Sequence, residues 1–363
     1  MRRLLEWTVL VPVLAIVALA LTWGQKPGAV LVGVVAVLLA GAVLAAVHHA
    51  EVVAHRVGEP FGSLVLAVAV TVIEVALIVT LMVSGGPETA TLARDTVFAA
   101  VMITTTGIVG ISLLLGARRF GVTLFNAEGS GAALATVTTL ATLSLVLPTF
   151  TTSQPGPEFT TPQLSFAALA SLALYAMFVL TQTVRHRDFF LPVAQRGQKE
   201  QEDCDDHAEP PSSREAMVSL GLLLVSLVAV VGLAKVESPT IEQGVAAVGF
   251  PPSFVGVVIA LLVLAPETLA AVRAAHRGRI QTSLNLAYGS AMASIGLTIP
   301  TIALATIWLD GPLVLGLGST QLVLLVMTVV VSVLTIVPGR ATRLQGGVHL
   351  VLLAAFLFLS VKP

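Results

Sequence analysis

Two glutamates, Glu74 and Glu267, stand inside long apolar stretches of the sequence. Glu74 comes thirteen residues after Phe61, and Glu267 comes thirteen residues after Phe254. A carboxylate at membrane depth costs about 2.5–3.5 kcal/mol even on the more lenient insertion scale, and such residues usually face a cavity or a partner. Carboxylate oxygens bind hard cations and also take up protons. The matched pair therefore predicts binding of cations and protons within the membrane, with protonated structural acids as the alternative.

The surroundings of the two glutamates repeat. Pro60-Phe61 opens the first apolar stretch, and Pro252-Ser253-Phe254 opens the second. Each stretch is followed by a short polar loop and a span rich in small and hydroxyl residues, with residues 104–107 in the first repeat and 289–296 in the second. The distribution of basic residues, described below, makes the two glutamate spans run in opposite directions. Inverted repeats with special residues near the midplane are typical of secondary transporters, and symmetric folding would bring the carboxylates together.

Further oxygen donors are available in the same regions. Calcium takes six to eight oxygen ligands, more than two glutamates can supply. The hydroxyls of Thr71, Thr105, Ser290 and Ser294 are candidate ligands, as are carbonyls freed if Pro266 breaks its helix. Ser290 and Ser294 are four residues apart and share a helix face. Hydroxyls in membrane helices also serve as packing contacts. Three glycines are expected to allow close helix packing: Gly107, Gly289 and Gly296.

The composition places these residues in a membrane protein. Of the 363 residues, 56% are hydrophobic and only 11% are charged, whereas soluble proteins carry about 25% charged residues. Several apolar runs have the length that a helix needs to cross a bilayer. The net charge of −1 argues against nucleic-acid binding, and the single cysteine, Cys204, forms no intrachain disulfide. The sequence has no phosphate-binding loop, hydrolytic motif or zinc-spaced cluster, so we predict neither an enzyme, an ATP-driven pump nor a cofactor.

We predict an all-α membrane protein with a first helix and two five-helix inverted repeats. The eleven expected transmembrane helices cover approximately residues 7–23, 29–50, 60–83, 95–116, 129–148, 164–184, 216–234, 252–272, 282–308, 313–336 and 346–361. With these spans, Lys26, Arg94, Lys235 and Lys362 lie on one side, and the other 15 of the 19 basic residues lie on the other side. The positive-inside rule then puts the N-terminus in the cytoplasm and the C-terminus outside an inner (plasma) membrane.

The chain divides into four predicted parts. Residues 1–28 hold the first helix, 29–184 the first transporter half, 185–215 a cytoplasmic acidic linker, and 216–363 the second half. Arg2, Arg3 and the following apolar run resemble a secretory signal, but an uncleaved helix is the simpler interpretation because further spans follow at once. The linker has six acids between Glu200 and Glu209. It is either a solvated connection or a patch that attracts divalent cations.

At the glutamate repeats the chain resembles the calcium/proton exchangers of the calcium/cation antiporter superfamily, in particular the bacterial ChaA-type branch. Residues 50–62, continuing without gaps to Glu74, are similar to the first signature repeat of that family. Residues 266–300, from Pro266-Glu267 through Gly289-Ser290 to Pro300, are similar to the second. The resemblance covers nearly the whole chain. It implies that Ca²⁺ and protons compete for Glu74 and Glu267, while rocking of one helix bundle against the other alternates access to them.

The sequence departs from the family pattern at two places. The family's usual signature has Gly-Asn three to four residues before each glutamate, whereas this chain has Val70-Thr71 and Val263-Leu264. The expected asparagine amides are missing, and Thr71 is a partial substitute. We therefore expect a Ca²⁺/H⁺ antiporter, with a Na⁺(K⁺)/H⁺ antiporter using the same residues as the alternative. A passive cation channel or an ion sensor is the remaining hypothesis, and a homo-oligomer is compatible with the sequence.

Overall fold

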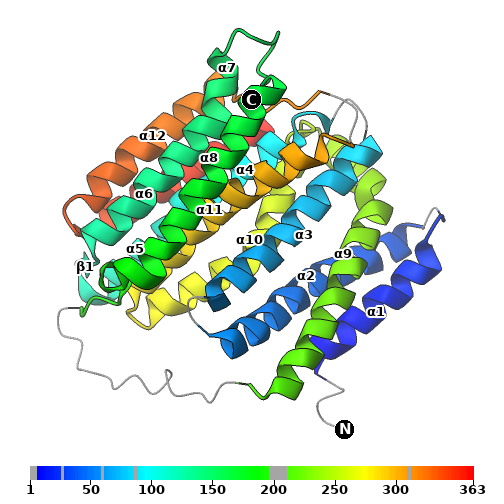
Figure 1. The fold of residues 1–363 in the computed structure, drawn as a ribbon, viewed down its shortest axis with the longest axis horizontal. Helices are drawn as coiled ribbons and strands as arrows, with labels where there is room; N and C mark the ends of the chain where they lie inside the picture. The colour runs from blue at the N-terminus through cyan, green and yellow to red at the C-terminus, as the bar shows by residue number, and fades with distance from the viewer. Residues whose placement is uncertain (1–5, 26–27, 59–60, 86–88, 196–210, 309–311) are drawn as a thin grey trace. The chain divides into compact units, whose positions relative to one another are not determined.

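The computed structural model describes residues 6–25, 28–58, 61–85, 89–195, 211–308 and 312–363, and these are helical almost throughout (Figure 1). The elements are α1 (Trp7–Thr22), α2 (Ala29–Val57), α3 (Phe61–Gly85), α4 (Leu92–Met102), η3 (Ile103–Ile108), α5 (Val109–Phe120), β1 (Thr123–Leu124), α6 (Ala127–Ala141), η4 (Thr142–Val146), α7 (Leu147–Phe150), α8 (Thr161–Leu180), η5 (Thr181–Arg185), η6 (Arg187–Phe190), α9 (Ser213–Ala247), α10 (Phe254–His276), α11 (Ile280–Ala305), α12 (Ser319–Ile336), β2 (Arg340–Ala341) and α13 (Arg343–Val361).

The eleven predicted spans are confirmed as helical segments. Within the described residues, ten helices are long and apolar enough to cross a membrane, and α1 is a shorter apolar helix. Three of the spans combine two or three elements, because short π-helical turns (η3, η4 and η5) interrupt them. The acidic core of the linker, including Cys204, lies outside the described residues.

Three span boundaries were clearly wrong. The second span was predicted to end at residue 50, but α2 continues to Val57. The seventh span was predicted to end at residue 234, but α9 continues to Ala247, through Pro239. Its polar second part is helical because neighbouring helices bury residues such as Glu237 and Ser238. The tenth span was predicted from residue 313, but α12 begins at Ser319. The preceding backbone instead bonds to the connection after α7, where the Gly316 N–H donates to the Pro157 carbonyl at 3.0 Å.

The chain forms two compact units, and each unit takes residues from both halves of the sequence. The first unit comprises residues 1–92 and 209–263, and the second comprises 93–208 and 264–363. In the first unit, α1, α2, α3 and α9 pack around an apolar cluster that includes Val47, Leu77 and Leu233. His49 bonds to the carbonyl of Thr8 at 2.9 Å and joins α2 to α1. This packing supports the interpretation of α1 as an integral helix.

The glutamate helices α3 and α10 start from opposite ends of α9. Arg56, at the end of α2, donates to Ser213 at the start of α9 at 2.9 Å, so α3 begins near the start of α9. At the other end of α9, the ring of Phe254 packs edge-on against Phe250 at 4.9 Å, and α10 begins there (Figure 1). The predicted opposite direction of the two spans therefore agrees with the packing of the first unit.

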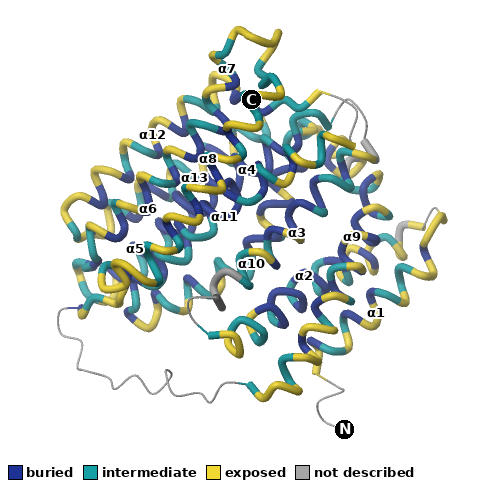
Figure 2. The backbone as a smooth tube through the Cα atoms, viewed as in Figure 1, coloured by how far each residue is buried: buried dark blue, intermediate teal, exposed yellow. Residues whose placement is uncertain are grey.

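The second unit is built around the span α4–η3–α5. It is the most enclosed of the candidate spans, with 89% of its most apolar stretch buried. The helices α11, α12 and α13 all pack against η3. Exposed residues recur along α12 in Figure 2 and include the large apolar side chains Val323, Val326 and Leu334. An apolar exposed face is what a helix in contact with lipid requires.

Basic residues of the second unit gather at one end. There Arg119 donates to the carbonyl of His276 at 2.6 Å, and β1 pairs with β2 through Thr123 and Ala341. Arg94 lies at the opposite end, where it donates to the carbonyl of Gly316 at 3.3 Å. This arrangement agrees with the predicted separation of Arg94 from the other arginines of the unit.

Candidate cation-exchange site

Glu74 is the fourteenth residue of α3, which begins at Phe61, one residue after the predicted start of the span. At a rise of about 1.5 Å per residue, it lies about 20 Å from the start of the helix. The side chain is buried, with 4% of its surface exposed. It shares one helical stripe with the buried residues Thr71, Ile78 and Leu81. The first unit therefore holds a carboxyl group and a hydroxyl group together on a buried helix face.

Glu267 has the same position in α10, which begins at Phe254. It is half-buried and lies on a stripe with the buried residues Leu264 and Ala271. The prediction that Pro266 breaks the helix was wrong, because α10 is continuous from Phe254 to His276. Proline has no N–H, however, so the usual hydrogen bond to the Leu262 carbonyl cannot form. One backbone acceptor is thus released from the helical ladder just before Glu267.

A chain of serines fixes α10 next to Glu267. Ser283 of α11 donates to the carbonyl of Ala271 at 2.8 Å, one turn after Glu267. The hydroxyls of Ser283 and Ser112 lie 2.5 Å apart, and Ser112 belongs to α5. Both serines are fully buried. The hydroxyl chain therefore connects the most enclosed span of the second unit with the helix that carries Glu267.

Thr105 lies in η3, where all six residues are buried. Its hydroxyl donates to the carbonyl of Val101 at 2.6 Å, and Thr104 and Thr106 make the same kind of bond to the preceding turn. A hydroxyl that donates its proton to the backbone still has lone pairs to offer a cation. π-Helical turns occur frequently at functional sites. These features suit Thr105 to the ligand role predicted for it.

The two predicted serine ligands lie on α11, which packs against η3. Ser294 is buried and Ser290 is half-buried. The structure thus brings the region of Thr105 and the helix of Ser290 and Ser294 together in the second unit. Glu74 and Thr71 belong to the first unit.

The expected packing role holds for two of the three glycines. A Cβ atom at Gly296 would lie 2.8 Å from Cβ of Tyr175, and one at Gly107 would lie 3.2 Å from Leu353. At Gly289 the explanation was wrong, because no described atom outside its own helical turn lies within 4 Å of such a position.

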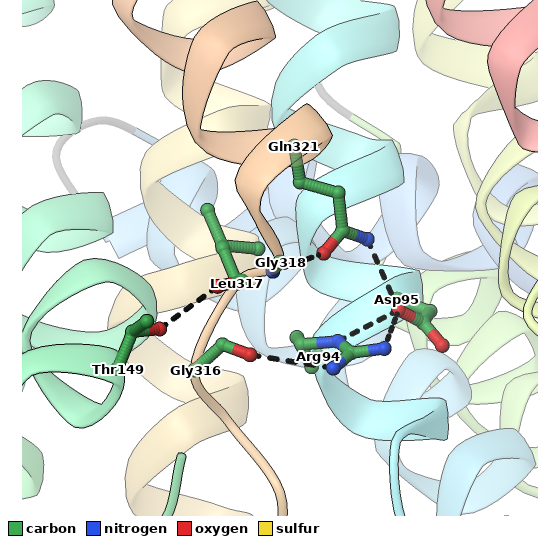
Figure 3. Close-up of polar contacts among 7 residues, drawn as sticks. All are labelled: Arg94, Asp95, Thr149, Gly316, Leu317, Gly318 and Gln321. Carbon is green, nitrogen blue, oxygen red and sulfur yellow. Dashed lines mark hydrogen bonds and ion pairs between the residues drawn. The ribbon is translucent and has the colours of Figure 1, made fainter. Parts of the chain in front are cut away.

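A buried ion pair at one end of the second unit was missed by the sequence analysis. Asp95, at the start of α4, is 4% exposed and receives two bonds of 2.8 Å from Arg94 (Figure 3). Gln321 of α12 donates to the same carboxylate oxygen at 3.3 Å. Arg94, Asp95 and Gln321 thus link the start of α4 with the start of α12. Arg94 neutralises the Asp95 carboxylate, which the predicted span from residue 95 placed at the membrane surface.

Glu237 was also missed, because α9 was expected to end before it. The residue is 2% exposed, and its Oε1 atom has no hydrogen-bond partner among the described residues. It lies in register with Val230, Leu233 and Ala234, the apolar face of α9. Only the packing of the first unit shows that this acid is buried. In the sequence it stands next to Lys235 and Pro239 and resembles a loop.

The comparisons with known proteins agree with this architecture. The family described as sodium/calcium exchanger protein matches residues 27–184 and 218–362. The y4hA protein of Sinorhizobium fredii is 44% identical over 98% of this chain and 96% of its own length. The sodium-potassium/proton antiporter ChaA of Escherichia coli is 35% identical over 97% of this chain and 95% of its own.

A solved structure shows the same fold. The native structure of YfkE covers 98% of this chain and 99% of its own length, with a TM-score of 0.71 at 16% identity. Another structure of the protein is described as that of a Ca²⁺/H⁺ antiporter. The matched segments of the sodium/calcium exchanger family extend over both glutamate helices and nearly every predicted span. The chain is therefore a multi-pass membrane protein that belongs to the sodium/calcium exchanger family, a family of cation antiporters and not of enzymes.

Proposed function

We propose that the chain exchanges Ca²⁺ for protons across the plasma membrane, and that Glu74 and Glu267 bind both. The N-terminus is cytoplasmic and the C-terminus lies outside in this proposal. Thr71, Thr105, Ser290 and Ser294 supply further oxygen ligands. The proposal keeps the two transporter halves, residues 29–184 and 216–363, as the inverted repeats that contribute one glutamate each.

One observation carries the proposal. Each glutamate is the fourteenth residue of a helix that begins with phenylalanine, and each lies on a buried stripe of that helix. The two helices also start from opposite ends of α9. An acid in this setting needs a proton or a cation as counter-charge, since a bare carboxylate is costly in the membrane. A purely structural pair has no reason to occupy equal positions in inverted repeats.

The mechanism follows from competition for the same oxygens. Removal from water disfavours the charged form of a carboxyl group, so the cation-free site takes up protons. Two ionised carboxylates match the charge of one Ca²⁺, and hydroxyl and carbonyl oxygens complete its shell. Cation binding expels the protons, and protonation from the other side expels the cation. Exchange is obligatory if the empty, doubly charged site cannot change its accessibility.

Sodium or potassium exchange for protons is the second candidate. It is favoured by the 35% identity to the sodium-potassium/proton antiporter ChaA and by the missing asparagines before both glutamates. A shell with fewer amide oxygens has less to offer a cation that prefers six to eight ligands. The same two glutamates serve in both candidates, so the difference lies in the ion and not in the proton-coupled residues.

Transport by purified protein in lipid vesicles tests the proposal. An imposed pH gradient should drive uptake of Ca²⁺, and a Ca²⁺ gradient should drive proton movement in strict linkage. Parallel experiments with Na⁺ and K⁺ rank the cations by the concentration that gives half-maximal proton movement. A lower value for Na⁺ or K⁺ than for Ca²⁺ would favour the second candidate. Cation flux without proton countertransport would indicate a channel and contradict both.

A further inference from the structure

His349 of α13 is completely buried, with 0% of its surface exposed, and its two ring nitrogens contact two different elements. Nδ1 lies 3.0 Å from the carbonyl oxygen of Thr105 in η3. Nε2 lies 3.2 Å from the hydroxyl oxygen of Thr335 in α12. A buried polar ring of this size is stable in a membrane span only when its nitrogens are bonded. The histidine therefore joins three elements of the second unit at one point.

The contacts assign the proton on the ring. A carbonyl oxygen can only accept, so Nδ1 carries hydrogen and donates to Thr105. In the neutral imidazole, Nε2 then accepts, and the hydroxyl of Thr335 donates to it. The contact with Thr105 is therefore directional, and an aromatic ring without nitrogen cannot replace it.

The backbone around His349 is held close to the enclosed span. A Cβ atom at Gly346 would lie 2.7 Å from the backbone nitrogen of Leu114 and 2.9 Å from the carbonyl of Gly110. One at Gly110 would lie 3.0 Å from Cβ of His349. The glycines thus let α13 approach α5 at the turn from which His349 reaches η3. The imidazole is placed by backbone packing and not by a flexible segment.

We infer that His349 is a positioning residue for cation binding: by holding the Thr105 carbonyl, it fixes the π-helical turn that presents the Thr105 hydroxyl to the ion. The inference rests on the proposed function, because Thr105 matters only if it contributes to that site. His349 itself does not touch the cation. Residues that hold a cation ligand in place without touching the cation typically change cation affinity by about ten- to a hundredfold when they are removed.

Variants of His349 test the inference in vesicles. His349→Phe keeps the ring but removes both nitrogens, and should raise the half-saturating cation concentration about tenfold or more, with a smaller change in maximal rate. His349→Asn places an amide N–H near the position of Nδ1 and should restore most of the affinity. Thr335→Val removes only the second partner and should stay within about twofold of wild type. An unchanged affinity in His349→Phe would overturn the inference.

A double variant shows whether His349 acts through Thr105. Thr105→Val alone should weaken cation binding, and adding His349→Phe should cause no further loss, because residues that act in one chain are not additive. A double variant whose loss of cation affinity equals the product of the two single losses would contradict the inference. His49→Phe is the matched control, since it removes another buried histidine–carbonyl bond, from α2 to Thr8 in the first unit. It should leave cation affinity unchanged.

These results separate the inference from the proposed function. If Glu74→Gln and Glu267→Gln abolish exchange while His349→Phe has wild-type affinity, only the positioning role fails. If either glutamine variant exchanges as the wild type does, the proposed paired-glutamate site fails independently of His349. Monodispersity and thermal unfolding of each purified variant identify misfolding. Where His349→Phe misfolds, His349→Leu, which also removes both ring nitrogens, takes its place: an unchanged affinity, or a further loss of affinity in the Thr105→Val background, would contradict the inference.

Discussion

Thr71 stands where the family signature usually has asparagine, on the buried stripe of α3 that also carries Glu74. A threonine hydroxyl offers one oxygen on a short side chain, whereas an asparagine amide reaches further with a carbonyl oxygen. Position 71 is therefore a candidate determinant of which cation is preferred. Thr71 has no carboxyl group to take up a proton, so in the proposed mechanism it contributes to cation binding alone, whereas Glu74 contributes to both cation and proton binding.

Replacement of Thr71 by asparagine should shift the preference toward calcium. Thr71→Asn adds a carbonyl ligand of the kind that Ca²⁺ accepts, and the two side chains have similar volume. The ratio of Ca²⁺ to Na⁺ transport efficiency should rise by up to about tenfold, or about 1.4 kcal/mol. Half-saturating concentrations of both ions, measured in vesicles, give this ratio. Thr80→Asn, on the same helix but about two and a half turns beyond Thr71, is the control and should leave the ratio unchanged.

At the scale of helices, close packing of α13 on α5 depends on one of two adjacent glycines. A Cβ atom at Gly346 would meet backbone atoms of α5 at 2.7 and 2.9 Å, whereas at Gly347 no described neighbouring atom lies within 4 Å. Backbone cannot move aside as a flexible side chain can. Alanine substitutions at Gly346 and Gly347 therefore differ mainly in whether the added methyl group collides with α5.

Gly346→Ala should destabilise the protein by about 1–3 kcal/mol through overpacking. Gly347→Ala should be neutral or stabilising by up to about 1 kcal/mol, because alanine favours the helix. Thermal unfolding of the purified protein in detergent, compared at one protein and detergent concentration, distinguishes them. Equal unfolding temperatures for the two variants would show that α13 does not lie against α5 as the structure has it.

Much of this helical order could be predicted from apolar run lengths, and α3 and α10 begin within two residues of the predicted starts at residues 60 and 252. The second part of α9 could not, because Lys235, Glu237 and Pro239 resemble a loop until neighbouring helices are known to bury them. The π-turn at Thr105 and its bond to His349 join residues 244 positions apart. No local pattern encodes such a contact, so the sequence alone did not point to His349.

At the scale of the whole molecule, the distribution of basic residues predicts how the chain crosses the membrane. Arg118 and Arg119 should face the cytoplasm, and the exposed loop around Ser153 should face outward. Arg119→Cys and Ser153→Cys, each made in a Cys204→Ser background, allow labelling of intact cells with an impermeant thiol reagent. Only the cysteine at position 153 should react before the cells are opened. The opposite pattern would overturn the proposed orientation.

The central claim is the proposal that Glu74 and Glu267 each bind both the cation and the proton. In this mechanism, replacing either glutamate removes a charged oxygen ligand and a proton carrier together. The remaining glutamate therefore cannot take over the role of the missing one. The described residues also offer a matched control in Glu237, which is buried in a membrane helix but has no part in the proposed site. Glu237→Gln removes the charge of a buried acid and leaves Glu74 and Glu267 in place.

The most direct measurement is cation-driven proton movement in vesicles containing purified, monodisperse Glu74→Gln, Glu267→Gln or Glu237→Gln protein. Glu74→Gln and Glu267→Gln should each abolish coupled exchange while the protein remains folded, because a neutral amide costs less in the membrane than a carboxylate. Glu237→Gln should exchange as the wild type does. Wild-type exchange by either of the first two variants would contradict the paired-glutamate mechanism, even though the chain would remain a member of its antiporter family.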